Sequence, residues 1–351
     1  MPTNTDFASG QEPAADYPVL TQPAGQRGFG ENYAFWIHDD ATGIQINGHL
    51  NTNEDIGAYG LRIARLSVLF PNGRTYLLHH TGGGSDDTSV AGGSLRYRCV
   101  DPFRRWTCEF DGVMNDVTIA RTFTSSAPLD CPHVHARFRI DTEMVAPAWL
   151  QGSFTEGGLG PVKGFIGGTR YEQLFRASGE LRVGEEAFPI EGFGNRTHRM
   201  GVRELAGAGD GPRMLGHVWA AAAFPGGSGF ALQSYPTDGG KLAWAEGHVA
   251  RNGALVPVEV VCVPWLCSYQ PSGEQFRIVL RARDGEIFEV TGETLATFNG
   301  IMLPAATPAE QVPLFQSCVR YRFGGETAVN MLERSLRRGC IETGIGRPQR
   351  C

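Results

Sequence analysis

The sequence lacks long apolar runs, an excess of positive charge and a signal for export. No stretch approaches the roughly 20 apolar residues that a membrane-spanning helix requires, so we expect no membrane insertion. Lys and Arg number 31 against 37 Asp and Glu, which gives a formal net charge of −6. A nucleic-acid-binding protein normally presents a basic surface, so we expect no nucleic-acid partner. Residues 1–20 lack the basic start and apolar core of a secretory signal, which favours a cytoplasmic location.

The common signatures of cofactor and metal sites are also missing. Residues 82–87 (GGGSDD) are rich in glycine but lack the flanking strand and helix of a phosphate-binding loop. His133 and His135 share a strand face without a third ligand at a suitable spacing. The eight cysteines are scattered, and residues 262–267 (CVPWLC) lack the second cysteine pair of a zinc site. We therefore expect reduced thiols, no cofactor and no metal.

What the sequence has in plenty is glycine and short strand patterns. Glycine accounts for 47 of 351 residues, without the period of three that collagen requires. Residues 59–70 (YGLRIARLSVLF) alternate, and a Pro-Asn-Gly turn with a second alternating run follows, which predicts a β-hairpin. Similar runs recur along the chain, so we expect an all-β protein of two domains. The glycine-rich residues 151–170 form either the boundary or a long loop over a pocket mouth.

The segment 191–204 (EGFGNRTHRMGVRE) concentrates charge and glycine in a region of strand patterns. In a regular strand, His198, Met200, Val202 and Glu204 share one face. This face combines apolar groups with an imidazole and a carboxylate, as in the wall of a mainly apolar binding pocket. Histidine also serves as an acid or base near neutral pH. The competing interpretation is an exposed strand edge, where charged residues prevent aggregation.

Several segments together carry a resemblance to a known family. Residues 31–51, 60–80 and 101–112 resemble the N-terminal half, and residues 170–204 resemble the start of the C-terminal half, of bacterial proteins with two lipocalin-like domains. These proteins are related to the carotenoid hydratases (hydroxyneurosporene synthases) and to AttH-like proteins. Fungal lipocalin-like Diels–Alderases are more distant relatives.

The resemblance implies a fold and a domain division. The expected fold is all-β, with two lipocalin-like (calycin-type) antiparallel β-barrel or sandwich domains. The division implied is a loose N-terminal arm at residues 1–28, a first domain at residues 29–168 and a second domain at residues 169–351.

In the family, a glycine and a short polar run precede the pattern Asp-His-Ser-Trp-Gly-x-Arg-Asp. Gly194, His198, Gly201 and Arg203 match this pattern, and Glu204 stands at the last acid. By this resemblance His198 is the acid–base group, Glu204 assists it, and Arg203 holds Glu204 or a substrate oxygen.

Two departures from the family pattern affect the expected chemistry. Thr197 stands at the acid before the histidine, and Met200 stands at the tryptophan. The missing aspartate is the natural proton donor of a hydratase. The proton donor of this chain then has to be His198, Glu204 or another carboxylate, such as Glu333.

The resemblance implies an enzyme of the lyase or isomerase class that needs no cofactor. Such an enzyme acts as a hydratase, a dehydratase or a double-bond isomerase on an apolar, alkene-bearing terpenoid, polyene or polyketide. A pericyclic cyclase of the Diels–Alderase type and a non-catalytic carrier of hydrophobic molecules are the alternatives. The sequence carries no signal for the oligomeric state.

Aromatic and polar side chains at alternating strand positions are the expected pocket lining. Tyr171 and Gln173 face the same way and can orient an oxygenated substrate. His217 alternates onto one face with Trp219. Ordinary core packing is the competing interpretation for the tryptophans and histidines. The expected lining residues are Trp36, Tyr171, Gln173, Met200, His217, Trp219, Trp244 and His248.

Overall fold

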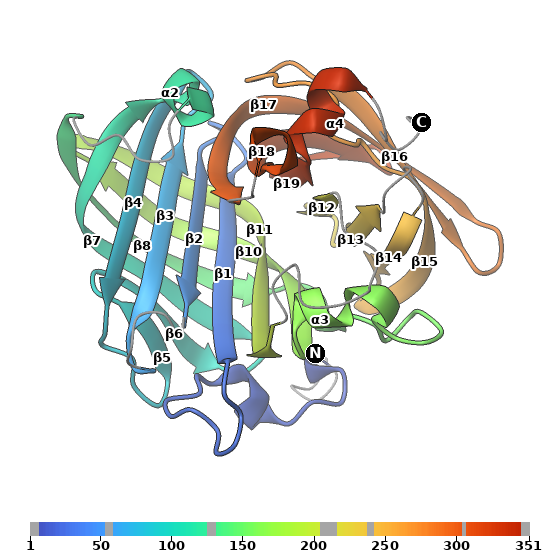
Figure 1. Cartoon of the computed structure of the whole chain (residues 1–351), viewed down its shortest axis with the longest axis horizontal. Coiled ribbons are helices and arrows are strands. Elements are labelled where there is room, and N and C mark those ends of the chain that lie inside the picture. The colour runs from blue at the N-terminus through green and yellow to red at the C-terminus, as the bar shows by residue number, and fades with distance from the viewer. Residues whose placement is uncertain are drawn as a thin grey trace.

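The computed structural model describes residues 7–52, 59–124, 131–203, 216–236, 242–303 and 307–344. These residues form two β-barrels that lie side by side (Figure 1). The predicted all-β class is confirmed, since antiparallel strands account for most of the described chain. Among the described residues, no helix is long and apolar enough to cross a membrane.

The first barrel is a sheet closed on itself. Its strands run in the order β4-β3-β2-β1-β11-β10-β8-β7, and β4 pairs with β7 to complete the ring. The strands β5 (Ser89–Gly92) and β6 (Leu95–Asp101) extend the sheet beyond β7, and β9 (Trp149–Leu150) pairs with β10. The ring strands are β1 (Phe29–Asp39), β2 (Gln45–Asn51), β3 (Arg62–Leu69), β4 (Arg74–Gly82), β7 (Arg105–Thr118), β8 (His133–Met144), β10 (Thr169–Val183) and β11 (Glu186–Val202).

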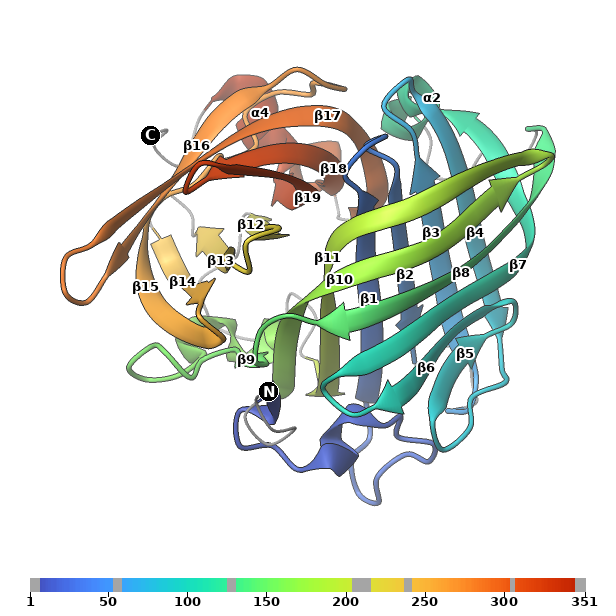
Figure 2. The same ribbon diagram turned by 180° about the vertical axis from the view of Figure 1, so that it is seen from behind.

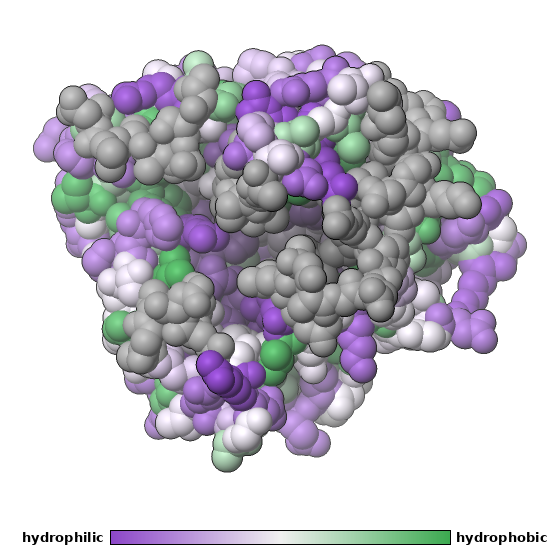
Figure 3. Space-filling view, viewed as in Figure 1, coloured by the Kyte–Doolittle hydropathy of each residue, from purple (hydrophilic) through white to green (hydrophobic). Residues whose placement is uncertain are grey.

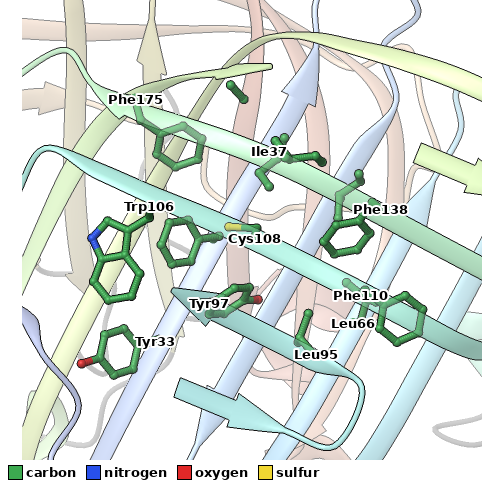
Figure 4. Packing of buried hydrophobic residues seen from close by; sticks show 14 of the residues in the cluster. Tyr33, Ile37, Leu66, Leu95, Tyr97, Trp106, Cys108, Phe110, Phe138 and Phe175 are labelled. Atoms are coloured by element: carbon green, nitrogen blue, oxygen red, sulfur yellow. The ribbon is translucent and has the colours of Figure 1, made fainter. Parts of the chain in front are cut away.

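Local sequence explains these strands. The hairpin predicted at the Pro-Asn-Gly turn joins β3 to β4, with Gly73 at a φ of 91° that favours glycine. Buried and exposed residues alternate along β8, as expected where one face covers a core and the other meets water. Aromatic rings such as Tyr33, Trp106 and Phe175 fill the interior of the first barrel (Figure 4).

The second barrel is closed by the pairing of its first and last strands, β12 and β19. Its interior is packed with apolar side chains, among them Phe230, Leu232 and Leu332. Its strands are β12 (Gly216–Ala223), β13 (Gly229–Pro236), β14 (Leu242–Arg251), β15 (Ala254–Cys262), β16 (Gln275–Ala282), β17 (Ile287–Leu303), β18 (Val312–Phe323) and β19 (Glu326–Leu336).

The helices are short and lie in the connections. Those of the α type are α2 (Ile119–Thr124), α3 (Lys163–Ile166) and α4 (Arg338–Thr343). The 3-10 turns are η1 (Pro13–Asp16), η3 (Gly160–Val162) and η4 (Pro308–Glu310). The glycine-rich connection that contains η3 and α3 links β9 to β10.

Two expectations about the domain division need correction. The boundary expected between residues 168 and 169 does not separate the two sheets, because β10 pairs with β8 and β11 pairs with β1 in the first barrel (Figure 2). The N-terminal arm is not loose throughout, because parts of it pack against the first barrel. Phe7 and Asp16 are buried, since Phe7 joins the apolar core and Asp16 meets polar groups inside the first barrel.

The expectation of eight reduced thiols also needs correction at one position. Cys262 is disulfide-bonded. The free cysteines among the described residues are Cys99, Cys108, Cys131, Cys267, Cys318 and Cys340.

The two faces of β10 and β11 have different surroundings. Tyr171 on β10 and His198 on β11 point into the first barrel, as do the neighbours two positions away. Glu172 and Asn195 point outward, toward β12, β13 and β19 of the second barrel. Near the end of β11, Gly201 has a φ of 133°, where a side chain would collide with the nearby backbone of the connection before β10. Alternation on these strands therefore creates two separate polar clusters.

Candidate functional site between the barrels

A network of ionised side chains lies inside the first barrel, where the N-terminal segment meets β11. Nη1 of Arg196 lies 2.7 Å from Oδ1 of Asp16, and both side chains are buried. Oδ2 of Asp16 accepts hydrogen bonds from the backbone N–H of Phe103 and the indole N–H of Trp106. Burial raises the pKa of Asp16. Arg196, Tyr171 and Phe103 lower this pKa by more than burial raises it, so the net pKa is below its usual value. Asp16 and Arg196 form a matched pair of charges.

His198 lies two residues beyond Arg196 on the same face of β11. Its Nδ1 lies 2.8 Å from the Tyr171 hydroxyl, and its Nε2 lies 2.9 Å from Oε1 of Glu31. The Tyr33 ring stacks on the imidazole, with 3.9 Å between ring centroids. His198 and Glu31 are both 0% exposed, so this pair has no edge that meets solvent.

Glu31 also contacts the second guanidinium of this interior. Nη2 of Arg62 lies 2.7 Å from Oε2 of Glu31, and the backbone N–H of Val19 donates to the same carboxylate. Burial raises the pKa of Glu31, but His198, Arg62 and Val19 bring it below its usual value. Each of the two carboxylates, Asp16 and Glu31, therefore contacts one guanidinium inside the first barrel. The contact of Asp16 with Arg196 anchors the N-terminal segment to this barrel.

A second polar cluster lies between the barrels, on the outward face of β10 and β11. Here the rings of Trp36 on β1 and Trp219 on β12 meet edge to face, with 5.8 Å between centroids. Figure 3 shows hydrophilic residues gathered in a recess between the two barrels. We call this cluster the interbarrel seam, and its members are Trp36, Arg170, Glu172, Asn195, Arg199, Arg203, His217, Trp219, Gln233, Tyr235, Gln316, Glu333 and Ser335.

Glu172 joins the two barrels at the centre of the seam. Burial raises the pKa of this carboxyl, and Arg170 acts in the opposite direction. Arg170 also lies over the Trp219 ring, 4.6 Å from its centroid. Since every contact of Glu172 is a donor, this residue organises the seam and has no oxygen without a partner. The donors lie at 2.6 to 3.1 Å and are Gln151 Nε2, Gln233 Nε2, Trp219 Nε1, Asn195 Nδ2 and Arg170 Nη2.

The seam contains its own histidine–glutamate pair. Nε2 of His217 lies 2.9 Å from Oε1 of Glu333, and Nδ1 lies 2.7 Å from the Ser335 hydroxyl. The amide of Gln316 donates to Oε2 of Glu333 at 2.8 Å, and the Tyr235 ring stacks on His217. Burial raises the pKa of Glu333, but His217 and Gln316 bring it below its usual value. The side chains of His217 and Glu333 retain 11% and 8% exposure, so this pair borders solvent-accessible space.

The outer face of β14 holds the glycine-rich connection rather than the His217 pair. Oε1 of Glu246 accepts a hydrogen bond from the indole N–H of Trp149 at 2.8 Å. His248 meets the same indole edge to face, and burial lowers the pKa of His248 to about 3. The indole N–H of Trp244 donates to the carbonyl of Gly158. Trp244 and His248 therefore pack against the connection between β9 and β10.

The site residues expected from the sequence divide between the two faces. The interior of the first barrel holds His198, Tyr171 and Gln173, and Met200 follows His198 on the same strand face. The face between the barrels holds Trp36, His217, Trp219, Trp244, His248 and Glu333. Arg203 follows the end of β11, and Glu204 lies outside the described residues. His198 and Glu333 thus lie on opposite sides of β11.

Several important residues were not among the expected site residues, including Glu31, Arg62, Arg170 and Arg199. Asp16 and Arg196 form the inner charge pair, while Glu172 and Tyr235 belong to the seam. The signal for Glu172 was present, because its neighbours Tyr171 and Gln173 were assigned to one face and alternation places Glu172 on the other.

A cavity of about 600 Å³ opens at another place, between α2 and the start of β18. It is lined mainly by apolar side chains, including Ile119, Phe123, Tyr269 and Phe315, with Arg338 at its edge. None of the carboxylates of the seam lines it. Its size falls within the range of small-molecule pockets, so it is a place for an apolar ligand without acid–base groups.

No group of three or more His, Cys, Asp or Glu is arranged around one point as metal ligands, as far as the described residues go. His135 instead contacts the exposed Asp111 through its Nε2.

The chain matches a family model and several solved structures. The model for the domain of unknown function DUF7064 matches residues 19–337. An AttH-like protein from Nitrosomonas europaea is 15% identical with a TM-score of 0.52, and the match covers 87% of this chain and 91% of that chain. CghA, solved with Sch210972, is 10% identical with a TM-score of 0.58, and 88% of each chain is covered. No curated protein matches the chain.

These structural matches show a shared fold. They confirm the predicted lipocalin-like class and, at the level of fold, the resemblance to AttH-like proteins. The resemblance to carotenoid hydratases rests on the sequence motifs alone.

Proposed function

Since this chain belongs to the DUF7064 family, we propose from its own side chains that it is a lyase or isomerase that transfers protons to and from a carbon–carbon double bond. The substrate is a mainly apolar small molecule, such as a terpenoid, polyene or polyketide, bound in the interbarrel seam. No cofactor takes part in this scheme.

The observation that carries the proposal is the exposed edge of the His217–Glu333 pair. A 2.9 Å bond joins the two groups, which can share one proton along it. The Tyr235 ring stacks on His217, and Trp219 stands opposite Glu333 in the strand register. Aromatic surface of this kind steadies a positive charge that develops on carbon. An acid–base group has to reach the reacting atom, and this pair borders accessible space.

The proposed step begins with transfer of the shared proton to one alkene carbon. The neighbouring carbon becomes cationic, and water adds there and returns a proton to the pair, which gives an alcohol. The reverse sequence removes water. Loss of a proton from the adjacent carbon, without water, moves the double bond. In each case the pair regains the proton that it gave.

His198 is a weaker candidate for this role than the sequence suggested. The His198–Glu31 pair has the same 2.9 Å bond, but both side chains are 0% exposed. Tyr33 covers one ring face of His198, and Tyr171 occupies its Nδ1. A substrate carbon has no route to this imidazole without opening the first barrel. We therefore assign the acid–base role to His217 and Glu333.

A bound small molecule in a protein of this fold adds support. CghA was solved with Sch210972, and this chain shares its fold with a TM-score of 0.58. A small-molecule substrate for this chain accords with that complex.

The test is incubation of the protein with a panel of terpenoids and polyenes in deuterated water, followed by mass spectrometry. Wild type should give products that carry deuterium, with a further mass gain of water where hydration occurs. The variant Glu333→Gln, which keeps the size of the side chain, should lose this incorporation. A product of unchanged mass formed equally by both proteins would indicate a pericyclic cyclase and contradict proton transfer.

A second candidate function is the non-catalytic carriage of a hydrophobic ligand, favoured by the apolar cavity beside α2. A carrier would release its ligand unchanged after denaturation. Phe123→Asp in the cavity wall should then abolish ligand recovery, while Glu333→Gln should not affect it.

A further inference from the structure

Three arginines lie together where β10 begins and β11 ends. Arg170 stands directly opposite Arg199 in the antiparallel register, and Arg203 follows one residue after β11. Burial, followed by the charges of Arg203 and Arg170, lowers the pKa of Arg199 to about 9. Like charges opposite each other on paired strands are destabilising. The arrangement therefore calls for a compensating negative group.

The described carboxylates do not supply that group to Arg199. Glu172 contacts Arg170 at 3.1 Å and is otherwise surrounded by neutral donors. Glu31 acts on Arg199 from a distance, but it lies inside the first barrel and is bonded there. Nη1 of Arg199 is buried and has no hydrogen-bond partner in the part of the chain that the structure describes. A buried charge that lacks a partner is costly, so it points to a ligand that supplies one.

We propose that Arg199, which lies opposite Arg170 on the paired strands, binds a carboxylate group of the substrate. A guanidinium matches a carboxylate through two parallel N–H···O bonds. The unpartnered Nη1 of Arg199 suits one such singly charged group. This inference rests on the proposed function, because the carboxylate site and the proposed reaction both require the substrate to lie in the interbarrel seam.

Tyr235 connects this arginine cluster with the histidine–glutamate pair. Its ring stacks on His217 with 5.8 Å between centroids. Burial raises the pKa of its hydroxyl to about 12, and Arg170, Arg203 and Glu333 are among the charges that act on it. Tyr235 thus lies within electrostatic reach of Arg170, Arg203 and Glu333. A substrate that spans it carries a carboxylate at one end and a double bond nearer His217, which describes an unsaturated, otherwise apolar carboxylic acid.

The experiment compares acids with their alcohols as ligands. Retinoic acid is paired with retinol, and dodecanoic acid with dodecanol, so each pair differs mainly in charge. Binding is measured by quenching of tryptophan fluorescence in wild type, Arg199→Gln and Arg199→Lys. The matched control is Arg182→Gln, which removes an equal charge from an exposed position on β10.

Wild type and the control should bind at least one acid about tenfold or more tightly than its alcohol, the range expected for a charge-assisted hydrogen-bonded pair. Arg199→Gln should bind acid and alcohol equally, and Arg199→Lys should keep part of the preference. Equal binding of every acid and alcohol by wild type, or a preference that survives in Arg199→Gln, would overturn the proposal.

The two proposals fail separately. A preference for acids that depends on Arg199, without deuterium incorporation into any substrate, would keep the carboxylate site and remove the proton chemistry. Deuterium incorporation without any preference for acids would do the reverse.

Discussion

The molecule contains two histidine–glutamate pairs of equal bond length in opposite surroundings. His198 and Glu31 lie 2.9 Å apart inside the first barrel, and His217 and Glu333 lie 2.9 Å apart in the seam. The inner pair is 0% exposed, and the charges around it are matched one to one. The seam pair borders solvent, and the seam contains Arg199, which no described carboxylate contacts. Arg62 inside the first barrel also has a buried nitrogen without a hydrogen-bond partner, but its charge is matched by Glu31. Pair geometry alone therefore does not identify a site, because access and unmatched charge distinguish the two.

The difference has a structural cause in the alternation of β10 and β11. Their inner face closes over a core and must satisfy its polar groups internally, because no water reaches it. Their outer face meets a second barrel across a surface that also includes polar groups from β12, β13 and β19. We infer that the inner network stabilises the fold and that the seam carries the chemistry.

The largest expected effect follows from breaking the inner charge match. Asp16→Ala leaves Arg196 buried without its carboxylate, and removal of one partner from a buried ion pair costs about 3–5 kcal/mol. We expect a loss of that order in the free energy of unfolding, measured by urea denaturation. Arg199→Gln in the seam is the contrast, and it should leave the free energy of unfolding unchanged or raise it. Equal losses in both variants would remove the distinction between the two regions.

The same distinction predicts sensitivity to acid. Asp16 and Glu31 have folded-state pKa values below the ordinary 3.8 and 4.5, so the unfolded chain binds more protons at low pH. Their stabilising contribution is full above the ordinary values and is lost as the pH falls through the lower, folded-state values. The urea midpoint should therefore drop as the pH falls below about 5.

The variant Asp16→Ala is a control for the predicted sensitivity to acid. In Asp16→Ala the drop with pH should be smaller than in wild type. An equal drop in both proteins would show that Asp16 does not titrate with a depressed pKa.

The smallest expected effect concerns the hydrogen bond between the Ser335 hydroxyl and His217. Ser335→Ala removes the hydroxyl 2.7 Å from Nδ1 of His217 but leaves the bond to Glu333. Loss of one hydrogen bond changes the free energy of unfolding by about 1 kcal/mol. We expect a fall in kcat of about tenfold or less, since His217 keeps its charged partner. An increase in exchange broadening of the His217 ring signals by NMR would show the loss of positioning.

Much of the fold followed from local patterns in the sequence. The Pro-Asn-Gly hairpin is present, and Tyr171 and Gln173 share a face as alternation predicts. The membership of β10 and β11 in the first barrel was not predictable in this way, because strand pairing depends on partners such as β1 that are distant in the chain. A glycine-rich connection resembles a domain boundary whether or not the sheet ends there.

The candidate site was harder to predict for the same reason. The N-terminal segment has the Pro, Gly and acidic composition of a loose arm, yet Asp16 meets Arg196, a residue 180 positions away. Strand alternation correctly placed His217 and Trp219 on one face of β12. Alternation alone does not show which face of a strand is closed to solvent. The family motif drew attention to His198, whose burial only the packed barrel reveals.

The most direct test replaces, in two separate variants, the glutamate of each histidine–glutamate pair. Glu31→Gln and Glu333→Gln are each assayed for free energy of unfolding and for the initial rate of deuterium incorporation per folded molecule. We predict that Glu31→Gln loses about 3–5 kcal/mol of stability and keeps its rate within about twofold. Glu333→Gln should lose about 100-fold or more in rate with a smaller change in stability. The opposite pattern, with the rate lost in Glu31→Gln and kept in Glu333→Gln, would contradict the assignment of the chemistry to the seam.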